Sequence, residues 1–448
     1  MYTNRFSRVG FILAAAGSAV GLGNIWKFPY ITGENGGGVF VFVYLLTVIL
    51  IGLSIFIAEV LVGSSTNQDS VTSFETLSPK GKKYWKYSGF TFLTGIIILS
   101  FYSIVVGWIL NYVVIALTNL PQNSAEAESV FMTMLKDDIF SQLFYYTLAF
   151  LIIAYTISKG VKKGIEKLNN YLMPTLIMIL IIMFFYSMSL SGFTKALEFM
   201  FYPNIEKFHA SSIIIAVGHA FFTLSIGMAT ILSYSASLDR NINIVKASIT
   251  IVSLDTLIAI VAGIIIFSVV FTAGQEPSQG PGLVFVTLPA IFYEMGIIGN
   301  IMAIAFFVAL AFAAITSAIS VLEPTVMYLV ERKKISRKKA TYGISFIFYI
   351  LGIFALLSNT NGFSEILTFG TKNLFDWFDF ITAAILMPLG GILLAVFVGY
   401  VMDKQQIRNK LVPLMGEKFF KLWLILIRYI APISVFFIML NETGLLKL

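Results

Sequence analysis

Long apolar stretches alternate with short polar segments along almost the whole chain. A helix needs about 20 mostly apolar residues to cross a bilayer, and most of these stretches reach that length. The pattern predicts an all-α polytopic membrane protein, and we interpret residues 1–448 as one transmembrane domain. We expect about eleven spans, at residues 8–29, 38–62, 88–118, 139–158, 166–190, 209–237, 247–272, 297–329, 340–358, 377–401 and 420–440.

The first span contains a segment that is unsuited to an uninterrupted helix. Residues 17–24 have the sequence Gly-Ser-Ala-Val-Gly-Leu-Gly-Asn. A Gly in a helix interior costs about 1 kcal/mol relative to Ala. Because lipid offers no water to an opened backbone, a break is tolerated only where the segment is buried in protein or lines a cavity. We therefore expect a site for a small charged ligand at this depth.

The sixth span has a matching interruption. Residues 221–227, Phe-Phe-Thr-Leu-Ser-Ile-Gly, place Thr, Ser and Gly within an apolar run. Spans one and six are corresponding members of two five-span halves, about 8–190 and 209–401. Because five is odd, the halves must be inverted relative to each other. Paired interruptions of this kind are typical of a transporter site near the bilayer midplane, and the helix at 420–440 lies outside the repeat.

Charged residues are scarce, at 12% of the chain against 58% hydrophobic residues, yet the net charge is +7. Most Lys and Arg residues lie in segments that begin near Arg5, Lys80, Lys159, Arg240, Arg332 and Lys404. Loops with few basic residues separate them, which predicts a cytoplasmic N-terminus and an external C-terminus. The positive charge therefore reflects topology, and we expect no nucleic-acid partner. The loop 273–296 falls on the external side, with a short helix expected from Val284 to Tyr293.

The residue inventory excludes several chemistries. The chain has no Cys and two His, which excludes disulfides and Cys- or His-rich metal clusters. It has neither a Gly-rich phosphate loop that ends in Lys-Ser/Thr nor a His-Glu-x-x-His helix, so we expect no enzyme. An intramembrane enzyme built on Asp255 and His219 is a weaker alternative, since no second carboxylate or nucleophile accompanies them. A signal peptide is an alternative for the first apolar run, although no convincing cleavage site interrupts it before Phe28.

Four motifs are similar to those of the neurotransmitter:sodium symporter family. They are Gly17 to Tyr30 (GSAVGLGNIWKFPY), Glu34 to Phe40 (ENGGGVF), Phe221 to Gly227 (FFTLSIG) and Thr316 to Pro324 (TSAISVLEP). The resemblance extends from about Ser7 to the end of the tenth span. It implies the leucine-transporter fold, with helices 1 and 6 unwound at mid-membrane, and symport by alternating access. The length and the absence of Cys resemble the bacterial amino-acid branch, which implies the bacterial inner (plasma) membrane.

The resemblance implies two sodium ions, which prefer hard oxygen ligands. One would be bound by the backbone of Gly17, Val20 and Ala313 and the hydroxyls of Thr316 and Ser317. The other would be bound by the Ala19 carbonyl, the Asn24 side chain, Thr223 and Asp255, and completed by the substrate carboxylate. A Thr-Ser pair alone is more often hydrogen-bonded to its own helix than a ligand. The glycine-rich break beside it favours the ligand interpretation.

The residue at position 21 bears on the class of substrate. Family members that carry monoamines have an aspartate there, whereas Gly21 leaves room for a substrate carboxylate. The amides of Leu22 and Gly23, the Tyr102 hydroxyl and the second sodium would bind that carboxylate, at a half-helix N-terminus that favours anions. The substrate amine would face the carbonyls of Ala19, Phe222 and Thr223 and the Ser225 hydroxyl. This arrangement predicts an α-amino acid.

The substrate side chain would meet a mostly apolar group of residues. These are Ile98, Tyr102, Phe222, Met228, Ser317, Ser320 and Val321. The Met228 thioether is flexible and contacts aromatic rings well. Together with Ser320, it favours a large hydrophobic or aromatic amino acid such as tyrosine or tryptophan. Tyr102 over Phe222 would form a lid above the substrate, although ordinary packing is the alternative role for both rings.

Asp255 is a carboxylate in the middle of an apolar span, which is costly and indicates function. Tyr44 matches a tyrosine near the chloride ion of chloride-dependent relatives. A fixed carboxylate at position 255 would supply that charge instead, so we predict chloride-independent transport. A structural hydrogen-bonded Asp is the alternative, and protonation of Asp255 during return of the empty carrier is left open. His219 is expected nearby, either paired with Asp255 or as a satisfied core histidine.

Two gates are implied by the resemblance. Outside, Lys27 and Asp379 match an ion pair in which the usual arginine is replaced by lysine. Inside, Glu331 matches the acidic residue, but the usual tryptophan is absent and Arg5 is the cation available. Glu59 resembles a carboxylate that binds the unwound segments, with snorkelling to the cytoplasmic face as the alternative.

The sequence thus predicts a sodium-coupled symporter that imports an α-amino acid. Gly164 and Pro174, with nine residues between them, match a family spacing linked to helix unwinding and inward release of sodium. By themselves they indicate only a kink. A sodium-independent amino-acid exchanger and an amino-acid sensor on the same fold are the alternatives. The expected partners are the amino acid and membrane lipid, while the sequence gives no oligomeric state and no sodium stoichiometry.

Overall fold

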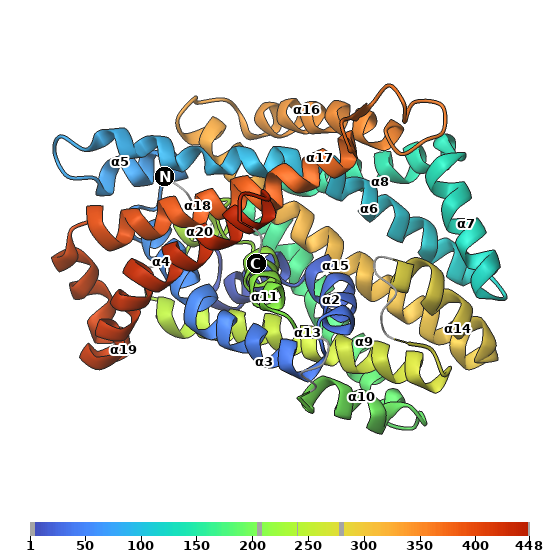
Figure 1. Cartoon of the computed structure of the whole chain (residues 1–448). Helices are drawn as coiled ribbons and strands as arrows, with labels where there is room; N and C mark the ends of the chain where they lie inside the picture. Colours follow the sequence, from blue (N-terminus) through green and yellow to red (C-terminus); the bar gives the residue numbers. More distant parts are fainter. Residues whose placement is uncertain (1–4, 204–207, 240, 277–281, 447–448) are drawn as a thin grey trace.

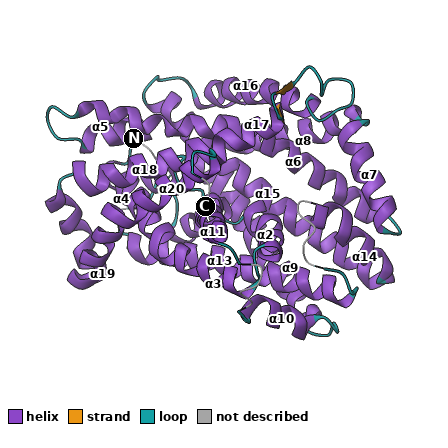
Figure 2. Cartoon of the chain, in the orientation of Figure 1, coloured by secondary structure: helices purple, strands orange, loops and turns teal. Residues whose placement is uncertain are grey.

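The computed structural model describes residues 5–203, 208–239, 241–276 and 282–446, and its regular structure is almost entirely helical (Figure 2). The first half contains α1 (Arg8–Ala19), η1 (Gly23–Lys27), α2 (Phe28–Glu34), α3 (Gly38–Thr47), η2 (Val48–Gly52), α4 (Leu53–Thr66), α5 (Ser70–Leu77), η3 (Lys83–Phe92), α6 (Leu93–Thr118), α7 (Ser124–Lys136), α8 (Ile139–Ser158), η4 (Val161–Glu166), α9 (Lys167–Ser187) and α10 (Phe193–Phe201). Of the η elements, η3 is a 3-10 helix and the others are π-helical turns.

The second half has a similar make-up. It contains α11 (Ala210–Thr223), α12 (Thr230–Ala236), α13 (Ile244–Thr272), η5 (Leu283–Thr287), α14 (Leu288–Glu294), α15 (Gly296–Glu331), α16 (Arg337–Leu357), α17 (Leu374–Phe380), η6 (Ile381–Leu386), α18 (Met387–Val396), η7 (Phe397–Val401), α19 (Lys404–Ile425), η8 (Leu426–Ile430) and α20 (Ala431–Glu442). The strands β1 (Thr368–Phe369) and β2 (Lys372–Asn373) form a small antiparallel hairpin before α17.

The helices match the predicted spans closely, with one difference in the count. Within the described residues, nine helices are long and apolar enough to cross a membrane, or ten if the bent pair α1 and η1–α2 is one span. The predicted span at 139–158 coincides with α8. The sixth predicted span, 209–237, consists of α11 and α12, each too short to cross alone because the chain is broken between them. The total of eleven spans, and the inversion of the two halves, stay predictions.

Elements that the charge pattern assigns to opposite sides of the membrane lie at opposite ends of the molecule. In Figure 1, α7 and α14 lie at the right and α10 lies at the bottom, whereas α5 and α19 lie at the left. The helix expected from Val284 to Tyr293 is confirmed as η5 and α14, and residues 277–281 of the same loop lie outside the described part. The helices α7 and α10 were not predicted, because they are short and amphipathic rather than long and apolar.

The outer surface of the bundle carries many large apolar side chains. Phe140 and Ile297 are about four-fifths exposed, and Phe42 is more than half exposed. In water such a surface would promote aggregation, but in a bilayer it contacts lipid chains that are equally apolar. The interior buries its own continuous apolar cluster, so the structure fits a membrane-embedded bundle.

Both predicted helix breaks are present. In the first, α1 ends at Ala19, Val20 takes an extended conformation (φ −69°, ψ 99°), and the axis bends by 48° before η1 and α2 continue. In the second, Ser225, Gly227 and Ala229 have positive φ angles of 53°, 85° and 59°, which no continuous helix allows. Gly227 is required on a second ground, because a Cβ there would collide with the backbone of α18.

A buried carboxylate holds the second break open. Glu59 of α4 accepts hydrogen bonds from the amides of Gly227 (2.9 Å) and Leu232 (3.3 Å). The Glu59 side chain is buried, which excludes the snorkelling alternative and confirms the contact that the resemblance implied. Amides freed by unwinding must find an acceptor in the absence of water, and Glu59 supplies it.

Candidate ligand and ion site at the helix breaks

A small cavity lies between the two breaks. Twelve of the thirteen residues predicted to bind substrate line it: Ala19, Gly21, Leu22, Gly23, Ile98, Tyr102, Phe222, Thr223, Ser225, Met228, Ser317 and Val321. They come from the break after α1, from α6, from the break after α11, and from α15. The remaining residue, Ser320, lies outside this lining, and its hydroxyl donates to the Ser317 carbonyl (2.7 Å).

The cavity has polar groups on the side of the first break and apolar side chains elsewhere. The Leu22 amide faces the Tyr102 hydroxyl at 3.5 Å, at the limit of a hydrogen bond. A Cβ at Gly21 would lie only 3.1 Å from the Tyr102 hydroxyl and from Ser317 Oγ. A side chain at position 21 would therefore crowd these two hydroxyl groups, and the polar end of the cavity is left to backbone and hydroxyl groups.

Beside the cavity, three buried side chains form a compact group of oxygens. Asn24 Nδ2 donates to the Asp255 carboxylate (2.8 Å) and to the Asp255 carbonyl (2.9 Å). The Thr223 hydroxyl lies 3.0 Å from Asn24 Oδ1 and 3.1 and 3.2 Å from the two carboxylate oxygens of Asp255. It has one proton for these three acceptors, so two of the three contacts bring oxygens together without a proton between them. A cation would satisfy this group.

The chemistry of this group fits a sodium ion. Asn24, Thr223 and Asp255 are buried, and within the described chain Asp255 forms no ion pair. A buried carboxylate without a positive partner is costly. Hard oxygen ligands with one negative charge suit a hard cation. Ala19, the fourth predicted ligand, lines the adjoining cavity.

The other predicted sodium group lies where α1 meets α15. A Cβ at Gly17 would lie 3.1 Å from Thr316 Cβ, and the Ser317 hydroxyl donates to the Ser18 carbonyl (3.1 Å). Here the Thr316 hydroxyl is bonded to its own helix, at the carbonyls of Phe312 (2.9 Å) and Ala313 (3.0 Å). The group is thus assembled, while ligation by Gly17, Val20, Ala313, Thr316 and Ser317 stays a prediction.

His219 does not pair with Asp255 in the described structure. Its ring stacks on Phe28 (centroids 5.8 Å apart) and lies 5.4 Å from the ring of Tyr44. Both ring nitrogens and the Tyr44 hydroxyl lack a hydrogen-bond partner among the described residues. Neither predicted role, a partner for Asp255 or a satisfied core histidine, is therefore observed.

The predicted outer ion pair is not formed in this conformation. Lys27 makes no ion pair with Asp379 in the described structure, and its Nζ instead lies 4.8 Å from the centroid of the Phe222 ring. A lysine lacks the bidentate fork that would fix it to a carboxylate, and a ring face is a favourable alternative for its charge.

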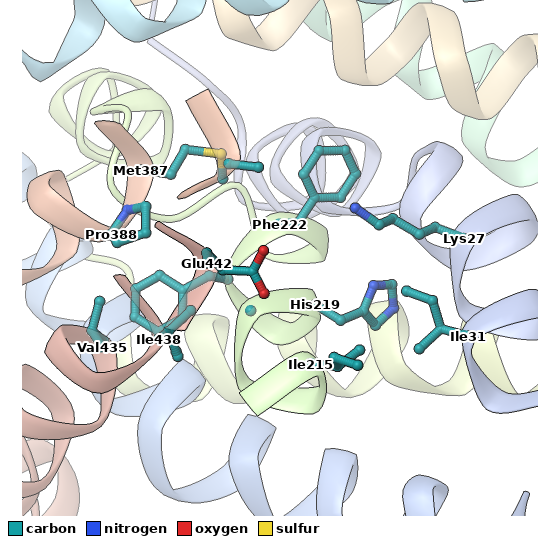
Figure 3. A pocket seen from close by; sticks show the side chains of 13 residues that line it. Lys27, Ile31, Ile215, His219, Phe222, Met387, Pro388, Val435, Ile438 and Glu442 are labelled. Carbon is teal, nitrogen blue, oxygen red and sulfur yellow. The ribbon is translucent and has the colours of Figure 1, made fainter. Parts of the chain in front are cut away.

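Phe222 separates the inner cavity from an outer pocket. It lines both, and the outer pocket has an empty volume of about 610 Å³. Figure 3 shows the Lys27 side chain directed at the Phe222 ring and the Glu442 carboxylate, from the end of α20, inside the same pocket. Sequence reasoning missed Glu442, because it lies in the helix outside the repeat. No local pattern marks it as facing the outer pocket.

The predicted inner latch is also not formed as expected. Glu331 accepts a hydrogen bond from the Asp69 amide (2.5 Å), and Arg5 is exposed without an ion pair to Glu331 in the described chain. Among the described residues, Arg332 pairs with Glu75 (3.0 Å), and the partly buried Arg337 pairs with the buried Glu323.

Sequence reasoning missed the Arg337–Glu323 pair. The available signal was a glutamate inside the apolar span at 297–329, within the motif Thr316 to Pro324.

Comparisons with known proteins identify similar sequences and structures among sodium-dependent transporters. The profile of the Sodium:neurotransmitter symporter family matches residues 3–138 and 131–446. The chain is 33% identical to the sodium-dependent transporter YhdH of Bacillus subtilis, over 98% of each protein, and 32% identical to a sodium-dependent transporter of Haemophilus influenzae, over 97% of each. The crystal structure of MhsT in complex with L-phenylalanine is similar to it with a TM-score of 0.89 and 39% identity, over 98% of this chain and 99% of MhsT.

Proposed function

The chain belongs to the sodium:neurotransmitter symporter family, and from that premise we propose that it imports a large hydrophobic or aromatic α-amino acid together with sodium. Members of this family are membrane transporters rather than enzymes, and they use sodium. The observation that carries the proposal is the cavity at the two breaks, which joins backbone amides, apolar side chains and the oxygens beside Asp255. The bound phenylalanine of MhsT supports an amino acid of this size.

Thr223 couples the amino acid to the ion. It lines the cavity and belongs to the oxygen group of Asn24 and Asp255. A substrate carboxylate at the amides of Leu22 and Gly23 lies next to that group and completes the shell of oxygens around sodium. Each ligand then raises the affinity of the other, by the same factor in both directions. This reciprocity lets the sodium gradient drive accumulation of the amino acid.

The apolar lining favours a large side chain. Ile98, Met228 and Val321 offer no hydrogen bonds, and Met228 adapts its shape to an aromatic ring. Phe222 closes the cavity toward the outer pocket, and Lys27 above it stabilises the closed ring. A small or charged amino acid would leave apolar surface unfilled or a charge unpaired, so it should be transported poorly.

Transport is proposed to be independent of chloride. Asp255 already places a negative charge beside the proposed sodium, and no positive side chain is paired with it in the described chain. A second anion there would meet that carboxylate at short range. The cost of this like-charge contact in a buried site disfavours chloride as a transported ion.

Uptake of radiolabelled amino acids into proteoliposomes tests these points together. Phenylalanine, tyrosine and tryptophan should accumulate with a sodium gradient, and replacement of sodium by choline should abolish accumulation. Replacement of chloride by gluconate should leave the rate unchanged, and an equal loss of uptake would overturn chloride independence. If uptake is unchanged when choline replaces sodium, the result would favour the sodium-independent exchanger. Sodium-dependent binding without uptake or counterflow would favour the sensor.

A further inference from the structure

Asn169 of α9 is a buried polar side chain with an unused oxygen. It is fully buried, and Oδ1 has no hydrogen-bond partner among the described residues. Its Nδ2 donates to the Ile165 carbonyl at 2.9 Å, which fixes the orientation of the amide, because a flipped amide would set two oxygens against each other. A buried oxygen without a hydrogen-bond donor is costly, which indicates that a donor or a cation binds there.

The unused oxygen is aimed at the predicted sodium group of α1 and α15. Asn169 Oδ1 is the atom closest to the place where a Cβ of Gly17 would be, and Thr316 is the next neighbour of the same point. Three groups therefore converge from three helices: the backbone at Gly17, the side chain of Thr316, and the amide oxygen of Asn169. A cation is the partner that fits, since the three nearest atoms to the point are the Asn169 oxygen and carbon atoms of Thr316 and Met173.

Glu166 lies one turn nearer the end of the molecule that carries α5 and the N-terminal segment. It is buried, and it forms no ion pair within the described chain. Its carboxylate accepts a hydrogen bond from the Ser7 hydroxyl (2.6 Å) and contacts Gly10, where a Cβ would collide with it. Glu166, the last residue of η4, and Asn169 of α9 are three residues apart, and both face α1: Glu166 contacts Gly10, and Asn169 contacts Gly17.

The N-terminal segment closes this row of oxygens. The Phe6 ring is buried 5.3 Å from the ring of Tyr234, and the Phe6 amide donates to the Ser237 carbonyl (3.0 Å). Ser7 follows directly and holds Glu166. Release of Ser7 would free the carboxylate at the same moment as it opens the end of the row.

We propose that Asn169 is a further oxygen ligand of the sodium ion at Gly17 and Thr316, and that Glu166 receives this ion next on its way to the cytoplasm. The inference rests on the proposed function, because it takes sodium as the ion. Asn169 contributes to equilibrium affinity, since it faces the ion in the closed structure. Glu166 contributes to the rate of release, since Ser7 occupies it until the N-terminal segment moves.

Sodium titration of the purified full chain without amino acid tests the role of Asn169. The melting temperature is followed as sodium replaces choline at constant ionic strength. Asn169→Leu should raise the sodium midpoint about tenfold, the usual order for loss of a contact to a charged group. Asn169→Asp should lower it, and Met173→Leu, which changes another side chain against Gly17, should leave it unchanged.

An unchanged midpoint in both Asn169 variants would overturn the ligand role. Absence of any sodium response in the unaltered chain would instead count against the proposed function itself.

Comparison of net uptake with exchange tests the role of Glu166. Net uptake requires that sodium is released and that the empty carrier returns. Exchange of external for internal amino acid requires neither step. Glu166→Gln should slow net uptake about tenfold or more while exchange and the sodium midpoint are kept. Equal loss of exchange and net uptake would assign Glu166 to folding or general closure and overturn its role in release.

Discussion

At the scale of single residues, the site depends on what is missing as much as on what is present. Gly21 contributes no side chain, and this absence leaves the Leu22 amide, the Tyr102 hydroxyl and Ser317 Oγ around one point. Asp255 contributes a charge for which the described chain provides no counter-charge. Each feature implies a ligand of opposite character, a carboxylate at the first and a cation at the second.

Substitution of Gly21 by Ala should impair substrate binding. The added Cβ would lie 3.1 Å from two oxygen atoms and would occupy the place proposed for the substrate carboxylate. We expect KM for the preferred amino acid to rise about tenfold or more, as expected when about 1.4 kcal/mol of binding is lost. Gly343→Ala, at a helix position with open space around it, is the matched control and should transport normally. Equal KM values in the two variants would contradict the assignment.

Removal of the Asp255 charge should weaken sodium binding. Asp255→Asn keeps the shape but replaces an anionic ligand by a neutral one, and Asn24→Ala removes a second oxygen. Both variants should need a higher sodium concentration for half-maximal uptake, with the larger shift for Asp255→Asn because a charge is lost. Sodium titration of uptake provides the measurement. Curves that coincide with that of the unaltered chain would exclude both residues from the site.

At the scale of elements, the two broken helices are held by side chains of intact helices and by each other. Glu59 of α4 binds amides of the second break, and Ser317 of α15 and Ser225 of the second break both donate to the Ser18 carbonyl. The broken segments thus form their missing backbone bonds with neighbours. If α1 or α12 moves, the freed backbone groups must find new hydrogen-bond partners, because buried groups without a partner are costly.

Replacement of Glu59 by Gln should destabilise the fold. Both carboxylate oxygens accept from amides, and a carboxamide would direct its own N–H at one of these donors. Loss of one such buried bond costs about 1–3 kcal/mol. The melting temperature of the purified variant should fall, and uptake should fall with it. Glu276→Gln, in an exposed loop, is the control, and a Glu59 variant as stable as that control would contradict the role.

The breaks could be predicted from sequence because Gly, Ser and Thr within an apolar run directly disfavour a continuous helix. The partners of long side chains could not. Lys27 points to Phe222 rather than to Asp379, and Glu331 meets the Asp69 amide, because these choices depend on packing between segments far apart in the chain. Asn169 was missed for the same reason: its position in α9 does not reveal that it faces Gly17.

At the scale of the whole molecule, the two ends of the bundle differ in ways that fit a fixed orientation in the membrane. The short helices α7 and α14 lie at one end of the molecule, and α5 lies at the other (Figure 1). The basic segment that begins at Lys80 follows α5 and overlaps η3, and the one that begins at Lys404 overlaps α19. We expect that end to face the cytoplasm.

Labelling of single cysteines should establish this orientation, since the natural chain has none. Glu128→Cys in α7 and Lys82→Cys in the loop after α5 both lie at exposed positions. A membrane-impermeant maleimide applied to intact cells should label Glu128→Cys and should label Lys82→Cys only after lysis. The reverse result would place the N-terminus outside and would contradict the predicted topology.

The contact between Glu59 and the backbone has a consequence for how substrate preference can evolve. Because Glu59 binds amides of Gly227 and Leu232, its hold on the loop is indifferent to the side chain at position 228 between them. Met228 is thus free to be replaced by a larger or smaller residue while the loop keeps its course. A single substitution at this position can therefore change the substrate preference while the surrounding site keeps its structure.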